Sequence, residues 1–110
     1  MENMYIEEIK KLFTLELSRE EIKEEIFKYH PYEISESLLE LSESERVQLY
    51  KSVTAEEIAY SIGYLEVEDA VMLFGEMKPK YIVGIIQELD IGDAVDVMQG
   101  LPEEEQAGYL

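Results

Sequence analysis

The most acidic stretch of the sequence is ELDIGDAVDVMQGLPEEE, residues 88–105, which holds seven carboxylates and no Lys or Arg. Carboxylate oxygens are the ligands that Mg²⁺ and Ca²⁺ prefer. Mg²⁺ keeps much of its water and needs only one or two of them. The same acids are also what an ordinary solvated helix face carries. Residue types and spacing leave both interpretations open.

Two of these acids form a pair if residues 90–101 are helical. Asp93 and Asp96 are three residues apart and lie about 60° from each other on the outward side of the helix. Such a pair destabilises a helix by about 0.2 to 0.5 kcal/mol unless a positive group relieves it. Asp90 fits the N-cap of this helix, and the three glutamates at 103–105 fit the first turn of the next. The buried stripe would comprise Ala94, Val97, Met98 and Leu101.

The elements that position these acids follow a repeat of twelve residues that starts at Ser18. Its ninth place has no polar exception and reads Ile26, Leu38, Tyr50, Ile62, Phe74, Ile86, Met98 and Leu110. Its twelfth place reads Tyr29, Leu41, Val53, Leu65, Met77, Leu89 and Leu101. Its fifth place alternates, with Ile22, Ile34, Ile58 and Ile82 against Arg46, Ala70 and Ala94. Places 5, 9 and 12 share one helix face, so each block predicts a short helix.

Helices this short are stable only when packed together. We therefore predict an all-α fold, a right-handed α-solenoid (an armadillo- or HEAT-like superhelix) of short antiparallel helices with a 12-residue helix period, in which two blocks form one structural unit. A stand-alone helical bundle is the rival architecture. We expect one domain over residues 1–110, with a longer capping helix in 1–17 and helical repeats over 18–110. The last block is unfinished, so we expect the chain to continue beyond it.

Composition excludes several classes of function. A net charge of −17 opposes direct binding to nucleic acid or to anionic lipid. The absence of Cys rules out disulfides and thiolate metal sites, and the acidic start MENMYIEEIKKLF does not fit a signal peptide. No apolar run is long enough to span a membrane. We expect a soluble segment with no direct membrane insertion.

No constellation of catalytic residues is present, so we predict that the chain is not an enzyme. The one histidine, His30, precedes Pro31 at a block start and is interpreted as a helix cap or turn residue rather than a base. The repeat places Tyr29 and Tyr50 in the core rather than on a stacking surface. The methionines Met72, Met77 and Met98 are interpreted in the same way.

Two segments resemble a known family. KYHPYEISESLLELSESERVQLYKSV resembles the pattern that opens the cytoplasmic N domain of MgtE-type magnesium transporters, and ELDIGDAVDVMQGLPEEE is similar to a recurrent acidic block of that domain. The similarity keeps the block register over roughly residues 18–110. The resemblance implies a fragment of a longer homodimeric chain with CBS domains and a membrane pore. It also implies a location on the cytoplasmic side of the bacterial inner membrane.

The resemblance further implies a magnesium sensor. Mg²⁺, bound weakly and shared with the CBS domains, would hold the two acidic surfaces together and close the pore when cytoplasmic Mg²⁺ is high. Asp96 occupies the family's ligand position, and Asp93 matches the second acid of its paired acids. Gly92 stands in place of the first acid, so Asp90 is the candidate replacement. Tyr60 stands where the family sometimes has another acid.

The alternative function is a helical-repeat scaffold for protein interactions, for example one like those of flagellar motor switch proteins, without a metal role. Any α-solenoid presents a concave surface that can bind a peptide. The expected metal ligands under the first hypothesis are Asp96, Asp93 and Asp90. The scaffold hypothesis assigns them no function beyond solvation.

Overall fold

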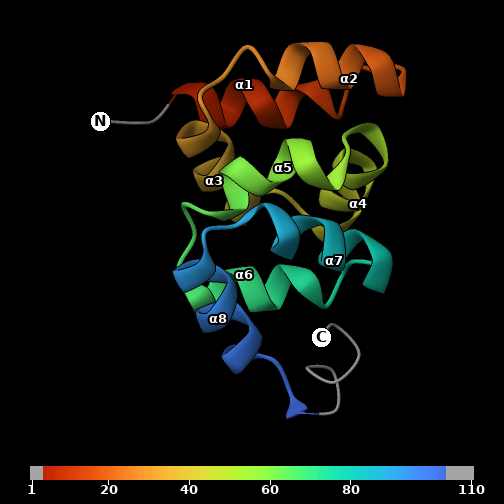
Figure 1. Ribbon diagram of the computed structural model, residues 1–110. Coiled ribbons are helices and arrows are strands. Elements are labelled where there is room, and N and C mark those ends of the chain that lie inside the picture. Colours follow the sequence, from red (N-terminus) through yellow and green to blue (C-terminus); the bar gives the residue numbers. More distant parts are fainter. Residues whose placement is uncertain (1–3, 104–110) are drawn as a thin grey trace.

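The computed structural model describes residues 4–103, and this part of the chain contains eight α-helices and no strand (Figure 1). The all-α prediction is confirmed. The helices are α1 (Met4–Leu12), α2 (Arg19–Ile26), α3 (Pro31–Glu40), α4 (Glu43–Ser52), α5 (Ala55–Ile62), α6 (Val67–Phe74), α7 (Pro79–Glu88) and α8 (Ile91–Gly100). Each helix from α3 onward begins twelve residues after its predecessor, as these bounds show. None of the described helices is long and apolar enough to cross a membrane.

Four helix starts are fixed by reciprocal side-chain caps. In each, the N-cap side chain accepts from a first-turn N–H, and a glutamate three residues later accepts from the N-cap N–H. These pairs are Ser18 with Glu21, His30 with Glu33, Ser42 with Glu45, and Thr54 with Glu57. The N–H of Tyr32 donates to His30 Nδ1 at 3.0 Å, which confirms His30 as a cap. The starts of these four helices are therefore determined by hydrogen bonds between residues close in the sequence, and not by long-range packing.

The helices pack mainly against partners two places along the chain. One layer runs through α1, α3, α5 and α7, while α2 packs on α4 and α6 on α8. In Figure 1 the helices succeed one another from α1 and α2 at one end to α6 and α8 at the other. The α1 helix ends earlier than a capping helix over 1–17 would. The chain turns through residues 13–16 instead, where Glu16 has a positive φ of 54°.

The core follows the predicted places of the repeat. Ninth-place side chains are buried at Ile26, Leu38, Tyr50, Ile62 and Phe74, and half-buried at Ile86 and Met98. Twelfth-place side chains are buried at Leu41, Val53 and Leu101, and half-buried at Tyr29, Leu65, Met77 and Leu89. The interpretation of Met72 as core is wrong, because it lies at the outward seventh place and is 53% exposed. Leu110 lies outside the described residues.

A charged network replaces apolar packing at one core place. Arg46, at the fifth place of its block, and Glu76, after α6, have side chains only 12% and 9% exposed. Arg46 Nε donates to Glu76 Oε2 at 2.9 Å, and its Nη1 donates to the carbonyls of Leu38 and Leu41. Tyr50 Oη donates to the same carboxylate at 3.0 Å. The network thus ties the end of α3 to α4 and to the turn after α6.

The packing of α7 against α5 depends on a glycine at one point of contact. A Cβ on Gly84 would lie 2.7 Å from Ala55 Cβ, which real contacts do not allow. We expect Gly84→Ala to destabilise the chain by about 1 to 2 kcal/mol, because the strain of overpacking exceeds the gain in helix propensity. Chemical denaturation measures this change. Gly92→Ala is the matched control, because a Cβ added at this position would meet nothing within 4 Å. This variant should be more stable than the unaltered chain. A stable Gly84→Ala variant would contradict the close approach.

Candidate acidic and aromatic pocket

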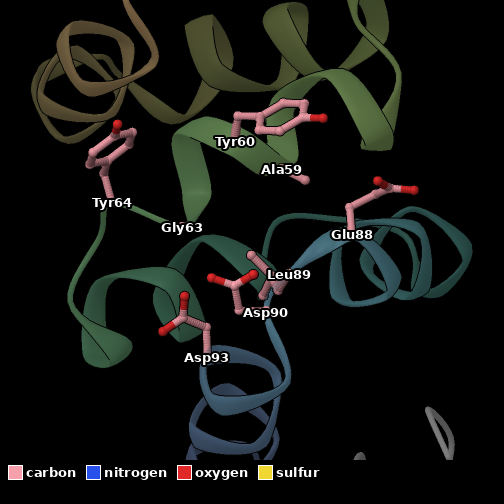
Figure 2. Close-up of a pocket in the computed structure, with 8 residues that line it drawn as sticks. All are labelled: Ala59, Tyr60, Gly63, Tyr64, Glu88, Leu89, Asp90 and Asp93. Carbon is pink, nitrogen blue, oxygen red and sulfur yellow. The ribbon is translucent and has the colours of Figure 1, made fainter.

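A surface pocket lies where α7 gives way to α8. Only Leu89 and Asp90 separate the two helices. Because Leu89 packs against the core, the connection lies close to the body of the protein. The pocket has a volume of about 340 Å³ and is lined by Ala59, Tyr60, Gly63, Tyr64, Glu88, Leu89, Asp90 and Asp93 (Figure 2). It therefore joins the end of α5 to the α7–α8 connection.

Three carboxylates line the pocket, and all are exposed. Glu88 ends α7, Asp90 precedes α8, and Asp93 lies in the first turn of α8. None of the three is paired with a Lys or Arg side chain among the residues that the structure describes. Asp90 is the N-cap residue, as predicted, but its side chain makes no capping hydrogen bond. Its carboxylate is consequently free to bind something else.

The predicted metal ligands do not all face this pocket. Asp90 and Asp93 line it, whereas Asp96 is exposed elsewhere on α8 and is not among its lining residues. Over residues 4–103, no three His, Cys, Asp or Glu side chains lie close enough together to hold a metal ion. Assignment of Asp90, Asp93 and Asp96 to Mg²⁺ stays a prediction. Glu104 and Glu105 lie outside the described residues.

The other wall of the pocket is aromatic. Tyr60 is 68% exposed and Tyr64 is 53% exposed, and Figure 2 shows them at the α5 end, apart from Asp90 and Asp93. The Tyr64 ring meets His30 and Tyr32 edge to face, with ring centroids 5.8 and 5.7 Å apart. These contacts restrict the orientation of the Tyr64 ring.

Sequence reasoning missed part of this pocket. It treated Tyr60 only as a missing acid, and it did not select Tyr64 or Glu88 as site residues. Tyr60 lies in α5 and Tyr64 lies two residues after its end, so helical spacing could not show that both residues line one pocket. A Cβ added at Gly92, where the first acid of the family's pair would stand, would meet nothing within 4 Å.

The chain is similar to known proteins in both sequence and fold. The family model described as the MgtE intracellular N domain matches residues 29–110, well over half of the chain. A solved structure described as "Crystal structure of the soluble part of a magnesium transporter" superposes with a TM-score of 0.75 at 24% identity. The alignment covers 96% of this chain and 41% of that one, so the chain spans under half of the matched structure. A search of the curated proteins found no match.

Proposed function

Because the chain belongs to the MgtE intracellular N domain family, we propose that it is the regulatory domain of a magnesium transporter. We further propose that it lies on the cytoplasmic side of the bacterial inner membrane, in a homodimeric protein that also has CBS and membrane domains. Its own role is to sense Mg²⁺ and not to catalyse a reaction. We also propose that the helical repeats are arranged as a right-handed α-solenoid.

The observation that carries this proposal is the set of unpaired carboxylates on α8 and at its start. Asp90, Asp93 and Asp96 are exposed, and no basic side chain within residues 4–103 pairs with them. A few exposed carboxylates bind Mg²⁺ weakly, because the ion gives up its water reluctantly. Useful affinity then needs a second acidic surface, for which we propose the CBS domains.

The proposed mechanism is a change in the balance between repulsion and bridging. When Mg²⁺ is scarce, the acidic faces of the two domains repel each other and the pore is free to open. When Mg²⁺ is abundant, ions shared between the faces hold the domains together and the closed state is favoured. A ligand shifts such an equilibrium only by its difference in affinity for the two states. The shared site provides that difference, since it exists only when the domains are docked.

We expect Asp96→Ala in the full-length transporter to weaken inhibition by Mg²⁺ about fivefold or more, because one ligand of the bridging ion is lost. Channel or uptake assays over a range of cytoplasmic Mg²⁺ measure this. Glu24→Ala, on the exposed face of α2, is the matched control and should leave inhibition unchanged.

Restoring the missing acid should act in the opposite direction. Gly92→Asp places a carboxylate in open space in the first turn of α8, and should increase sensitivity to Mg²⁺. The favourable helix dipole and the repulsion from Asp96 act in opposite directions, so stability should change by no more than about 0.5 kcal/mol. Unchanged inhibition in both Asp96→Ala and Gly92→Asp would remove this face from the sensor. It would favour the alternative, an interaction scaffold without a metal role.

A further inference from the structure

We propose that a second pocket, between α4 and the start of α7, receives an aromatic side chain from a partner protein segment that carries acidic residues beside it. The pocket has a volume of about 250 Å³ and is lined by Val47, Tyr50, Lys51, Glu76, Met77, Lys78 and Tyr81. None of the predicted metal ligands is among these residues. The inference therefore goes beyond the proposed response to Mg²⁺ and does not depend on it.

The walls of this pocket are apolar and are held in place before any partner arrives. Tyr50 is only 8% exposed and donates its hydroxyl to Glu76 Oε2 at 3.0 Å, while Tyr81 donates to a backbone carbonyl at 3.0 Å. The centroids of the two rings are 5.9 Å apart, and the ring planes are tilted by 47°. Val47 and Met77 complete the apolar lining. Because tyrosine rings and a methionine sulfur both make favourable contacts with a further ring, an aromatic side chain suits this pocket.

The size of the pocket favours one side chain over a larger free ligand. Pockets that enclose drug-sized molecules have volumes of about 300 to 1,000 Å³. The volume here, about 250 Å³, lies below that range. Protein interfaces commonly place a single aromatic side chain in a small pocket of this kind, where it loses its water and contributes much of the affinity. The occupant is therefore assigned to a protein segment.

Positive charge at the open side of the pocket selects an acidic partner. Lys51 and Lys78 are exposed, and neither is paired with an acid among residues 4–103. Lys78 is the N-cap residue of α7, where the helix dipole disfavours a cation, and α7 is the one described helix without an acid in its first turn. A carboxylate that docks beside Lys78 relieves this unfavourable charge. Since the net charge of −17 repels an acidic segment from most of the surface, the two lysines give the contact its specificity.

The one acid that lines the pocket is already paired. Glu76 Oε2 accepts from Arg46 Nε at 2.9 Å, and the side chains of this ion pair are only 9% and 12% exposed. The same carboxylate accepts from the Tyr50 hydroxyl. The guanidinium offsets the charge of Glu76, so this acid adds little repulsion against an acidic partner.

The test is a titration of the 110-residue chain at physiological ionic strength with a capped glutamate-phenylalanine-glutamate tripeptide, followed by amide chemical shifts. We expect shifts confined to residues 47–51 and 76–81. The peptide with alanine in place of phenylalanine should bind about fivefold more weakly or worse, because the pocket then stays unfilled. The peptide with lysine in place of both glutamates should produce no shifts confined to these two segments.

Three lysine variants with the same loss of charge test the electrostatic contribution. Lys51→Gln and Lys78→Gln should each weaken binding of the acidic peptide by about twofold to fivefold, the usual effect of one exposed ion pair. Lys80→Gln is the matched control, because Lys80 is also exposed on α7 but does not line the pocket. This variant should bind as the unaltered chain does. Amide spectra of each variant without the peptide show directly whether the fold is retained.

Three results would overturn the proposal. Equal binding of the phenylalanine and alanine peptides would show that no side chain enters the pocket. Unchanged binding by both Lys51→Gln and Lys78→Gln would show that the lysines do not select the partner. Binding of free 3-phenylpropionate as tight as that of the acidic peptide would assign the pocket to a small carboxylate and not to a protein segment.

This proposal and the magnesium proposal fail independently. Asp96 does not line this pocket, so Asp96→Asn should bind the acidic peptide normally while losing Mg²⁺ inhibition in the full-length transporter. Lys78→Gln should show the opposite combination, with weaker peptide binding and normal inhibition. If the peptide fails to bind but Asp96→Asn still loses inhibition, the pocket proposal alone is wrong.

Discussion

Replacing Arg46 by Met lowers the free energy of unfolding by about 3 to 5 kcal/mol, the usual cost of breaking a buried ion pair. The substitution leaves the Glu76 carboxylate in a site where it is only 9% exposed, with Tyr50 as its remaining partner. It also removes the donor to the carbonyls of Leu38 and Leu41. Urea denaturation followed by circular dichroism measures the loss.

Two further variants test the physical cause of that loss. The double variant Arg46→Met, Glu76→Leu should recover more than half of it, because no unpaired charge stays buried. Lys23→Met breaks the 2.8 Å pair with Glu57, whose side chains are 43% and 30% exposed, and should cost less than about 1 kcal/mol. Equal losses for Arg46→Met and Lys23→Met would show that burial of the Arg46 pair has no energetic consequence.

We expect alkaline pH to destabilise the chain through two tyrosines, Tyr50 and Tyr81. The pKa of Tyr50 is raised above its ordinary value of 10.0 by burial and then by the charge and hydrogen bond of Glu76. The pKa of Tyr81 is raised by burial and then by the charges of Glu57 and Glu56, and its hydroxyl donates to the Val53 carbonyl at 3.0 Å. Both phenols therefore keep their protons in the folded state at pH values where unfolded tyrosines lose them.

Because both pKa values are raised in the folded state, the free energy of unfolding falls as the pH rises above 10. Below pH 10 both states are protonated, and the contribution of the two tyrosines to stability is complete. As the pH rises from that value toward the folded pKa values, the unfolded state releases protons first. Each tyrosine then subtracts about 1.4 kcal/mol for every pH unit. Denaturation curves at successive alkaline pH values, with phenolate absorbance as a second signal, measure this slope.

A single substitution tests the assignment of the alkaline slope. Tyr81→Phe should lose about 1 kcal/mol at neutral pH, with its hydrogen bond, and should show a shallower alkaline slope than the unaltered chain. An unchanged slope in Tyr81→Phe and in Tyr50→Phe would assign the alkaline transition to other groups. Because both rings pack near each other, with centroids 5.9 Å apart, the double variant need not equal the sum of the two.

Much of the helical framework could be predicted because its causes are local. Apolar residues at places 9 and 12 mark one helix face, and residues such as Ser18 and Thr54 cap the starts. The eighth place was predicted as core only at Val97, although Leu49, Ile85 and Ser37 are fully buried at that place in their own blocks. The period of one helix shows the centre of its buried face, whereas the width of that face depends on how the neighbouring helices pack against it.

Long-range pairing could not be predicted from the same pattern. Arg46 breaks the apolar fifth place, and nothing near it in the sequence indicates why. Its partner Glu76 lies 30 residues away and meets it only because the turn after α6 comes beside α4. Whether a charged residue at a core place of the repeat is destabilising or has a partner of opposite charge therefore depends on the tertiary fold.

The sequence by itself determined the helices, the main apolar face and the acidity of residues 88–105, since composition and helical period are properties of the chain alone. Only the tertiary structure decided which of those acids line the pocket and which lie elsewhere on the surface. Asp90 and Asp93 share a pocket with Tyr60 and Tyr64, whereas Asp96 lies outside it. The reason is that a helix wheel gives the direction of a side chain from its own axis. The neighbour it meets depends on the sharp α7–α8 connection and on the position of α5.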